Sequence, residues 1–153
     1  MKYAKIKPGQ YFDYFFMAYF NFYARFYAFR RSLAEKIVAL WRFRPVRLYV
    51  LLAGLLNISA WLEAFFIRRN LTGNFLILHY NVDFGVDLVS APKRIFVYPL
   101  YGLAVILVNF LFSVVLFRRE DGRLFVHFLL ATAVCFSALL VLALMFIYLI
   151  NFN

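Results

Sequence analysis

The sequence predicts an all-helical membrane protein with three transmembrane helices, preceded by one or two amphipathic interfacial helices. Three apolar stretches indicate this class: Leu48–Ile67, Ile95–Phe117 and Leu124–Ile150. Each reaches the roughly 20 apolar residues that a helix needs to cross a hydrocarbon core about 30 Å thick. The chain is also 66% hydrophobic, against about 45–50% apolar residues in soluble domains. We therefore expect an aromatic and basic segment over residues 1–45 and a three-span bundle over residues 46–153.

Basic residues predict the orientation. Of the seventeen Lys and Arg, ten precede the first stretch, three lie in the loop 118–123 and only four lie in the loop 68–94. Short basic loops stay in the cytoplasm, so we expect the N-terminus inside, and the loop 68–94 and the C-terminus outside, of a bacterial inner membrane. The net charge of +10 then reflects topology and attraction to anionic lipid, and no nucleic-acid partner is expected.

The segment before the first span is unusually aromatic. Tyr11–Phe29 holds twelve Phe and Tyr in nineteen residues, and aromatic rings favour the boundary between headgroups and hydrocarbon. One helical stripe would face water in an interfacial helix: Asp13, Met17, Asn21, Arg25 and Ala28. The alternative is a further span, which would bury Asp13, Asn21 and Arg25 at considerable cost.

Two signals concern the helix boundaries that follow. Ser32-Leu-Ala-Glu35 has the spacing of a capping box, which would start a second amphipathic helix. One continuous helix through Arg30 and Arg31 is the alternative. Pro45 should end or kink whichever helix reaches it.

Small and polar residues form stripes within the three stretches: Ala53, Asn57, Ala60 and Ala64; Gly102, Asn109 and Ser113; His127, Ala131, Cys135 and Ala138. Small residues and interhelical hydrogen bonds hold membrane helices together, so we interpret these stripes as packing contacts. Counted from the ends of their stretches, Asn57 and Asn109 lie at similar depth, which predicts a contact between them.

Two ionisable residues stand inside the stretches. Glu63 lies about one turn from the outer end of the first, where an unpaired carboxylate is costly. We expect an ion pair with Lys93 or Arg94, and a proton relay is the alternative. His127 lies near the inner end of the third stretch and is interpreted as an interfacial residue.

The loop 68–94 carries the most individual pattern. Alternation and β-branched residues over Phe75–Lys93 predict a short extended or looped segment packed on the outer ends of the spans, with Gly85 free to adopt a positive φ. Four polar residues are the candidate recognition residues: His79, Asn81, Asp83 and Asp87. A metal site would need these side chains to converge, and linear spacing does not require that. We therefore expect no metal, no cofactor and no catalytic residue.

Part of the chain resembles a known domain. An apolar run, His79-Tyr80-Asn81, a Gly and an Asp, a Lys, and a span that opens with Ile-Phe-Val-Tyr-Pro99-Leu make up the pattern. It resembles a domain of bacterial membrane proteins found at the N-terminal end of the immunity proteins against the sporulation-delaying toxin. The resemblance covers about 48–117, but the Pro expected before His79 is absent and the Gly-to-Asp spacing differs. It implies a small helical bundle with an outward loop, and toxin immunity with membrane signalling is the function best known for it.

We interpret the chain as a non-enzymatic accessory, sensing or structural subunit of the inner membrane. Its outward loop would meet a ligand or partner, either a second copy or another membrane protein. The alternative is a small oligomeric carrier or channel that uses Asn57, Asn109 and Glu63. A carrier should direct these residues into a water-filled cavity, whereas a scaffold should bury them in dry helix contacts.

Overall fold

The structure is a computed structural model that describes residues 8–81 and 85–152, with side chains from Phe22 onward except at 79–81, 86 and 87. In chain order, the elements are α1 (Pro8–Arg42), α2 (Arg44–Asn70), β1 (Leu76–Asn81), β2 (Gly85–Ser90), a 3₁₀ helix η1 (Pro92–Phe96), α3 (Val97–Leu116) and α4 (Gly122–Phe152). The chain divides into two compact units, residues 1–39 and 40–153.

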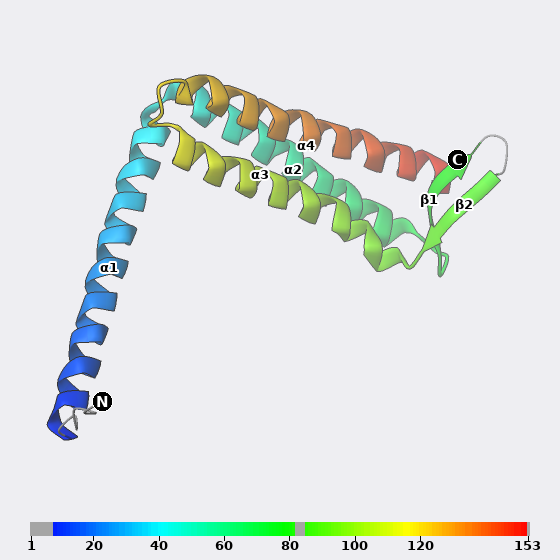
Figure 1. Ribbon diagram of the computed structural model, residues 1–153. Coiled ribbons are helices and arrows are strands. Elements are labelled where there is room, and N and C mark those ends of the chain that lie inside the picture. The colour runs from blue at the N-terminus through cyan, green and yellow to red at the C-terminus, as the bar shows by residue number, and fades with distance from the viewer. Residues whose placement is uncertain (1–7, 82–84, 153) are drawn as a thin grey trace. The chain divides into compact units, whose positions relative to one another are not determined.

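The larger unit confirms the three predicted spans. The helical segments Arg44–Asn70, Pro92–Leu116 and Gly122–Phe152 are long enough to cross a membrane, and their most apolar 18-residue windows have mean hydropathies of 1.9, 2.2 and 2.8. α2, α3 and α4 run side by side along the bundle (Figure 1), and α4 packs against both of the others. The fold is thus the predicted all-helical membrane class, with a small hairpin at one end.

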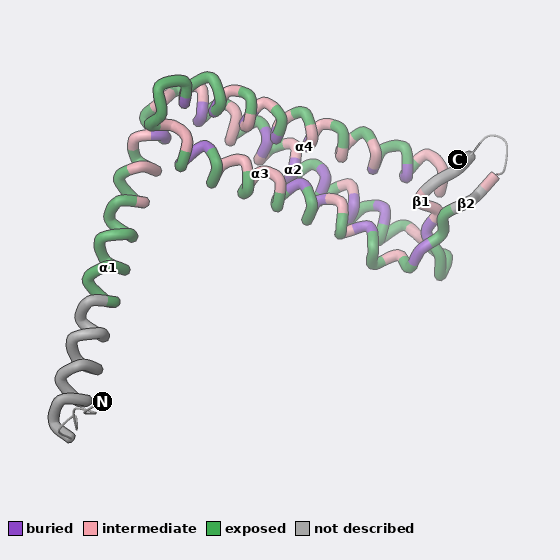
Figure 2. The backbone as a smooth tube through the Cα atoms, in the orientation of Figure 1, coloured by how far each residue is buried: buried purple, intermediate pink, exposed green. Residues whose placement is uncertain are grey.

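Apolar side chains cover the outside of this bundle. Only 28%, 22% and 22% of the most apolar windows in the three segments are buried, although the residues are Leu, Phe and Val. Buried positions form narrow lines where the helices meet (Figure 2), and many of them are small: Ala53, Ala60, Ala64, Gly102, Ser113, Ala133 and Ser137. Small residues where helices touch, and large apolar residues on the outer surface, are the arrangement expected in lipid.

α1 is one continuous helix over Pro8–Arg42. The break proposed at Ser32 is therefore wrong, and the continuous alternative is correct. Glu35 does not cap a helix start; its Oε1 accepts a hydrogen bond from Arg31 Nε at 3.2 Å, one turn earlier on the same helix. α1 is not among the candidate spans that the described residues provide.

Pro45 marks the boundary between α1 and α2, as expected. α1 ends at Arg42, Phe43 has extended backbone angles, and Pro45 lies in the first turn of α2. Proline is tolerated there because the first N–H groups of a helix have no intrahelical acceptor.

The loop 68–94 contains an antiparallel hairpin, so the extended one of the two predicted alternatives is correct. β1 pairs with β2 from Leu76↔Ser90 to Asn81↔Gly85, with irregular register around His79. Gly85 has φ of 77°, the left-handed region that glycine adopts at little cost. The hairpin lies at the same end of the bundle as the C-terminus (Figure 1).

Candidate functional site

Among the residues the structure describes, four side-chain hydrogen bonds join different elements of the bundle, at three levels. We call the end with the hairpin the hairpin end, and the end with the turn between α3 and α4 the loop end. The bonds lie at the hairpin end, in the middle and at the loop end. These hydrogen bonds identify polar residues whose role is to hold the elements together.

At the hairpin end, Asn151 of α4 clamps β1. Its Oδ1 accepts a hydrogen bond from Ile77 N–H at 3.0 Å, and its Nδ2 donates to the Ile77 carbonyl at 2.8 Å. The same Nδ2 also donates to the carbonyl of Ile147, one turn back on α4. One carboxamide therefore holds both backbone groups of a strand residue.

An apolar cluster supports this clamp. Leu76, the first residue of β1, is fully buried, and it packs in one core cluster with side chains from α2, η1 and α4: Ala60, Ala64, Ile67, Ile95, Leu144 and Ile147. The hairpin is thus part of the core of the bundle at its base and projects away from it toward Asn81 and Gly85.

In the middle of the bundle, Asn57 joins α2 to α3. Its Nδ2 donates to the carbonyl of Pro99 at 2.9 Å, and the residue is 6% exposed. Gly102 lies directly opposite, where a Cβ would come within 2.5 Å of Asn57 Nδ2. Glycine permits this close approach, because Gly102 has no side chain that would displace the carboxamide of Asn57.

The predicted contact between Asn57 and Asn109 is wrong. Asn109 Nδ2 donates to Val105 O in its own helix at 2.9 Å, and Gly102, which faces Asn57, lies nearly two turns away. The depth count failed because α2 begins at Arg44, four residues before the apolar stretch. Asn57 is thirteen residues into its helix, whereas Asn109 is seven from the end of α3.

At the loop end, His127 lies in an aromatic cluster that the sequence did not indicate. Its Nδ1 is 3.3 Å from the hydroxyl of Tyr49. The rings of Phe43 and Tyr49 both meet the imidazole edge-on, with centroids 5.5 and 5.7 Å away. His127 is half-buried and joins α4 to α2, which is a packing role.

The predicted ion pair of Glu63 is absent among the described residues. Oε2 of Glu63 is buried without a hydrogen-bond partner there, while Lys93 and Arg94 are exposed. The rotation of α2 accounts for this. Trp61 lies on the side of α2 that meets η1, with its ring 6.0 Å from that of Phe96. Glu63 is two residues, about 200°, further round the helix and lines a groove with α4.

The four candidate recognition residues are placed only in part. His79 and Asn81 belong to β1 and Asp87 to β2, but their side chains lie outside the described ones, and Asp83 lies outside the described residues altogether. No group of three His, Cys, Asp or Glu side chains that could hold a metal ion occurs in the part of the chain that was described.

A groove separates the base of the hairpin from the start of α3. It has a volume of about 250 Å³ and is lined by Leu78, Arg94, Val97, Tyr98 and Tyr101. Large apolar side chains are also exposed on β2 and just before β1: Phe75 at 71%, Leu88 at 51% and Val89 at 47%. The sequence did not single out Tyr98, Tyr101 or Asn151. All three are ordinary residues in apolar helices, and only their position beside the hairpin distinguishes them.

No protein-family profile matches this chain, and no curated protein and no solved structure is significantly similar to it.

Proposed function

We propose that the chain is a non-enzymatic accessory subunit of a bacterial inner membrane, in which the three-helix bundle holds a recognition hairpin on the outer face. The observation that carries this proposal is the double hydrogen bond between Asn151 and Ile77, supported by buried Leu76. A two-stranded hairpin is marginally stable alone. Tying its base to the last helix gives a fixed element that is suited to recognition.

Two of the three candidate intramembrane residues, Asn57 and Asn109, favour a scaffold over a carrier, whereas Glu63 lines a groove. Asn57 is buried against Pro99, and Asn109 bonds its own helix. Two serines of the spans, Ser113 and Ser137, likewise donate to carbonyls four residues earlier. These are the dry helix contacts expected of a structural bundle, since polar groups in lipid need partners within the protein.

Charge supports the orientation of this proposal. Six arginines stand at the loop end: Arg42, Arg44, Arg47, Arg118, Arg119 and Arg123. Four basic residues stand at the hairpin end. The more basic end is expected in the cytoplasm, which places the hairpin outside. The resemblance of residues 48–117 to the toxin-immunity domain supports an outward loop of the same kind.

The partner we propose is another membrane protein that meets the hairpin and the groove beside it. Exposed Phe75 and Tyr101 flank this surface, and aromatic and arginine side chains dominate many protein interfaces. Arg94 at the groove would supply the cation.

Site-specific photo-crosslinking in intact cells tests the proposal. We expect p-benzoylphenylalanine at Phe75 or Tyr101 to give one discrete protein adduct after irradiation. The same group at Phe128, which is exposed near the loop end of α4, is the control and should give none. Equal adducts at all three positions, or none at Phe75 and Tyr101, would contradict the proposed interface.

A further inference from the structure

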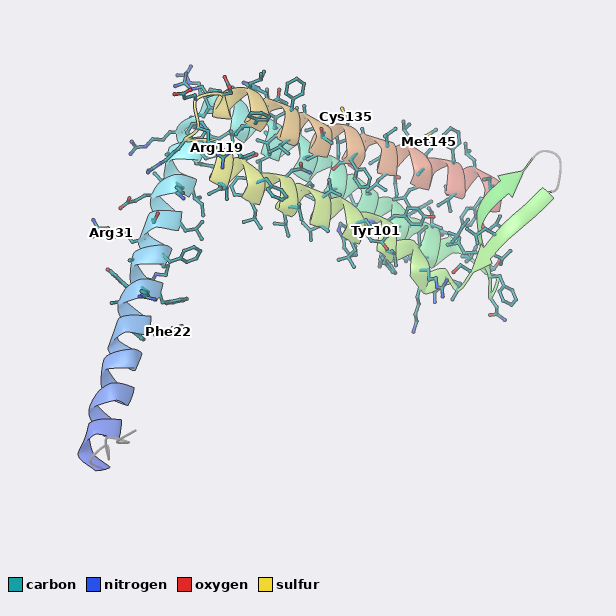
Figure 3. The ribbon with its side chains drawn as sticks, viewed as in Figure 1. Phe22, Arg31, Tyr101, Arg119, Cys135 and Met145 are labelled. Atoms are coloured by element: carbon teal, nitrogen blue, oxygen red, sulfur yellow. The ribbon has the colours of Figure 1, made fainter. Side chains whose placement is uncertain are left out.

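We propose that the groove between α2 and α4 at the hairpin end binds a hydrophobic organic cation, with the Glu63 carboxylate as its counter-ion. The groove has a volume of about 310 Å³ and is lined by Glu63, Phe66, Ile67, Leu144, Met145 and Tyr148. Met145 marks its position on α4 (Figure 3). This site goes beyond the proposed accessory function and does not depend on the hairpin.

The charge of the ligand follows from Glu63. Its Oε2 is buried and has no hydrogen-bond partner among the described residues. A carboxylate in apolar surroundings is costly unless it is paired, and ionisable residues inside membrane spans mark functional sites by default. A cation at the groove would supply the missing partner.

Aromatic rings form one wall of the groove and favour the same ligand. The rings of Phe66 on α2 and Tyr148 on α4 lie 5.8 Å apart, and Tyr148 stacks on Phe152 at 4.9 Å. Aromatic faces attract cations, and the attraction is stronger where water is excluded. The Glu63 carboxylate and the aromatic rings therefore both favour a positively charged ligand.

The remaining wall indicates an apolar body. Ile67 and Leu144 are 1% and 0% exposed and belong to the core cluster, so they form a fixed floor. Met145 is 53% exposed, and an unbranched thioether adapts its shape to a ligand.

The volume and the polar groups narrow the ligand class. Ligand pockets are usually about 300–1,000 Å³, so this groove suits one small molecule. It offers a single carboxylate and the Tyr148 hydroxyl, which is too few oxygen ligands for a hydrated metal ion. Arg69 lines an adjoining groove with Glu63 and adds positive charge nearby, which disfavours multivalent ligands. A monovalent cation with aromatic or alkyl groups fits all these features.

Equilibrium binding of radiolabelled tetraphenylphosphonium to the full chain in lipid nanodiscs tests the site. We expect saturable binding, and we expect Glu63→Gln to weaken it about tenfold or more, because a charge-assisted contact is lost. Glu120→Gln is the matched control: it removes the same charge from an exposed residue of the turn between α3 and α4 and should bind like the wild type.

Two further measurements keep the test decisive if Glu63→Gln folds poorly. Met145→Trp retains the carboxylate but fills the groove, so it should abolish binding. Neutral triphenylphosphine oxide should not displace the cation. The proposal would be overturned if Glu63→Gln and Glu120→Gln bound the cation with equal affinity, or if Met145→Trp bound it fully. Displacement by the neutral compound would also overturn it, because the groove would then bind apolar molecules whether or not they are charged. None of these outcomes affects crosslinking at the hairpin.

Discussion

Asparagine and serine side chains on these apolar helices bond to their own helix, to a neighbouring element or to both, and the neighbouring surface decides which. Asn109 and Ser113 donate to carbonyls four residues earlier. Asn57 instead donates to the Pro99 carbonyl of α3, because Gly102 leaves room for its side chain there. Identical side chains, Asn57 and Asn109, thus play different parts, which residue type alone does not reveal.

Gly102→Ala should lower the free energy of unfolding by about 1–3 kcal/mol, the usual cost of overpacking. The new Cβ would lie 2.5 Å from Asn57 Nδ2 and 2.9 Å from Leu140 Cδ1, and moving Asn57 would break its bond to Pro99. Thermal unfolding of the detergent-solubilised protein measures the effect.

Gly54→Ala is the matched control, because a Cβ at Gly54 meets nothing within 4 Å. It should leave the unfolding temperature unchanged or raise it slightly, since alanine favours helices. A loss of stability in Gly54→Ala as large as in Gly102→Ala would show that the effect does not arise from the contact with Asn57.

The hairpin is the element whose stability depends most on the rest of the molecule. Its two strands pair only with each other, and such a ribbon has little stability of its own. Leu76 ties its base to the core cluster, and Asn151 fixes Ile77. The loop sequence is compatible with extended strands, but the anchor is Asn151 of α4, 74 positions after Ile77.

Asn151→Ala should loosen β1 while leaving the helices intact. The Ile77 amide donates directly to Asn151 Oδ1, so we expect its hydrogen exchange to accelerate about tenfold, the equivalent of roughly one lost hydrogen bond. Hydrogen–deuterium exchange with mass spectrometry measures this for peptides of β1, with peptides of α3 as the internal reference.

Asn70→Ala provides the comparison, since Asn70 bonds only the Phe66 carbonyl of its own helix in the described structure. Exchange in β1 should stay at the wild-type rate in this variant. If Asn151→Ala also left β1 unchanged, Leu76 and the strand pairing alone would hold the hairpin.

The whole molecule is built for a lipid environment. Most of each apolar helix remains on the surface, and charged residues gather at the two ends of the bundle: Arg44, Arg47, Arg118 and Arg119 at one end, and Arg68, Arg69, Lys93 and Arg94 at the other. An apolar band between two basic rims matches a bilayer with its headgroups.

Single cysteines at Thr72 and Glu120, each in a Cys135→Ser background, should report opposite sides of the membrane. Both positions are exposed, in the loop before β1 and in the turn before α4. Glu120 is preferred to the nearby Gly122, because a Cβ at Gly122 would clash with the carbonyls of Leu116 and Phe117. We expect an impermeant thiol reagent to label position 72 on intact cells and position 120 only after permeabilisation. Labelling at 120 alone would reverse the proposed orientation.

The class of the protein follows from its sequence alone. Apolar length determines how many helices can span a bilayer, so the three spans of the larger unit were predictable. The local backbone rules for proline and glycine were equally informative at Pro45 and Gly85. The capping box at Ser32 misled, because Arg31 on the same helix bonds Glu35 and a short cap signal does not outweigh a continuous helix.

Only the tertiary structure decided which polar groups meet. The register of α2 against α3 pairs Asn57 with Pro99, and the rotation of α2 turns Glu63 away from η1 and toward Tyr148. The fold likewise brings Asn151 beside Ile77, although 74 positions separate them in the sequence. Depth and rotation depend on how small residues interlock between helices. A linear count of residues along one helix carries no information about the helix beside it, which is why these contacts could not be derived from the sequence.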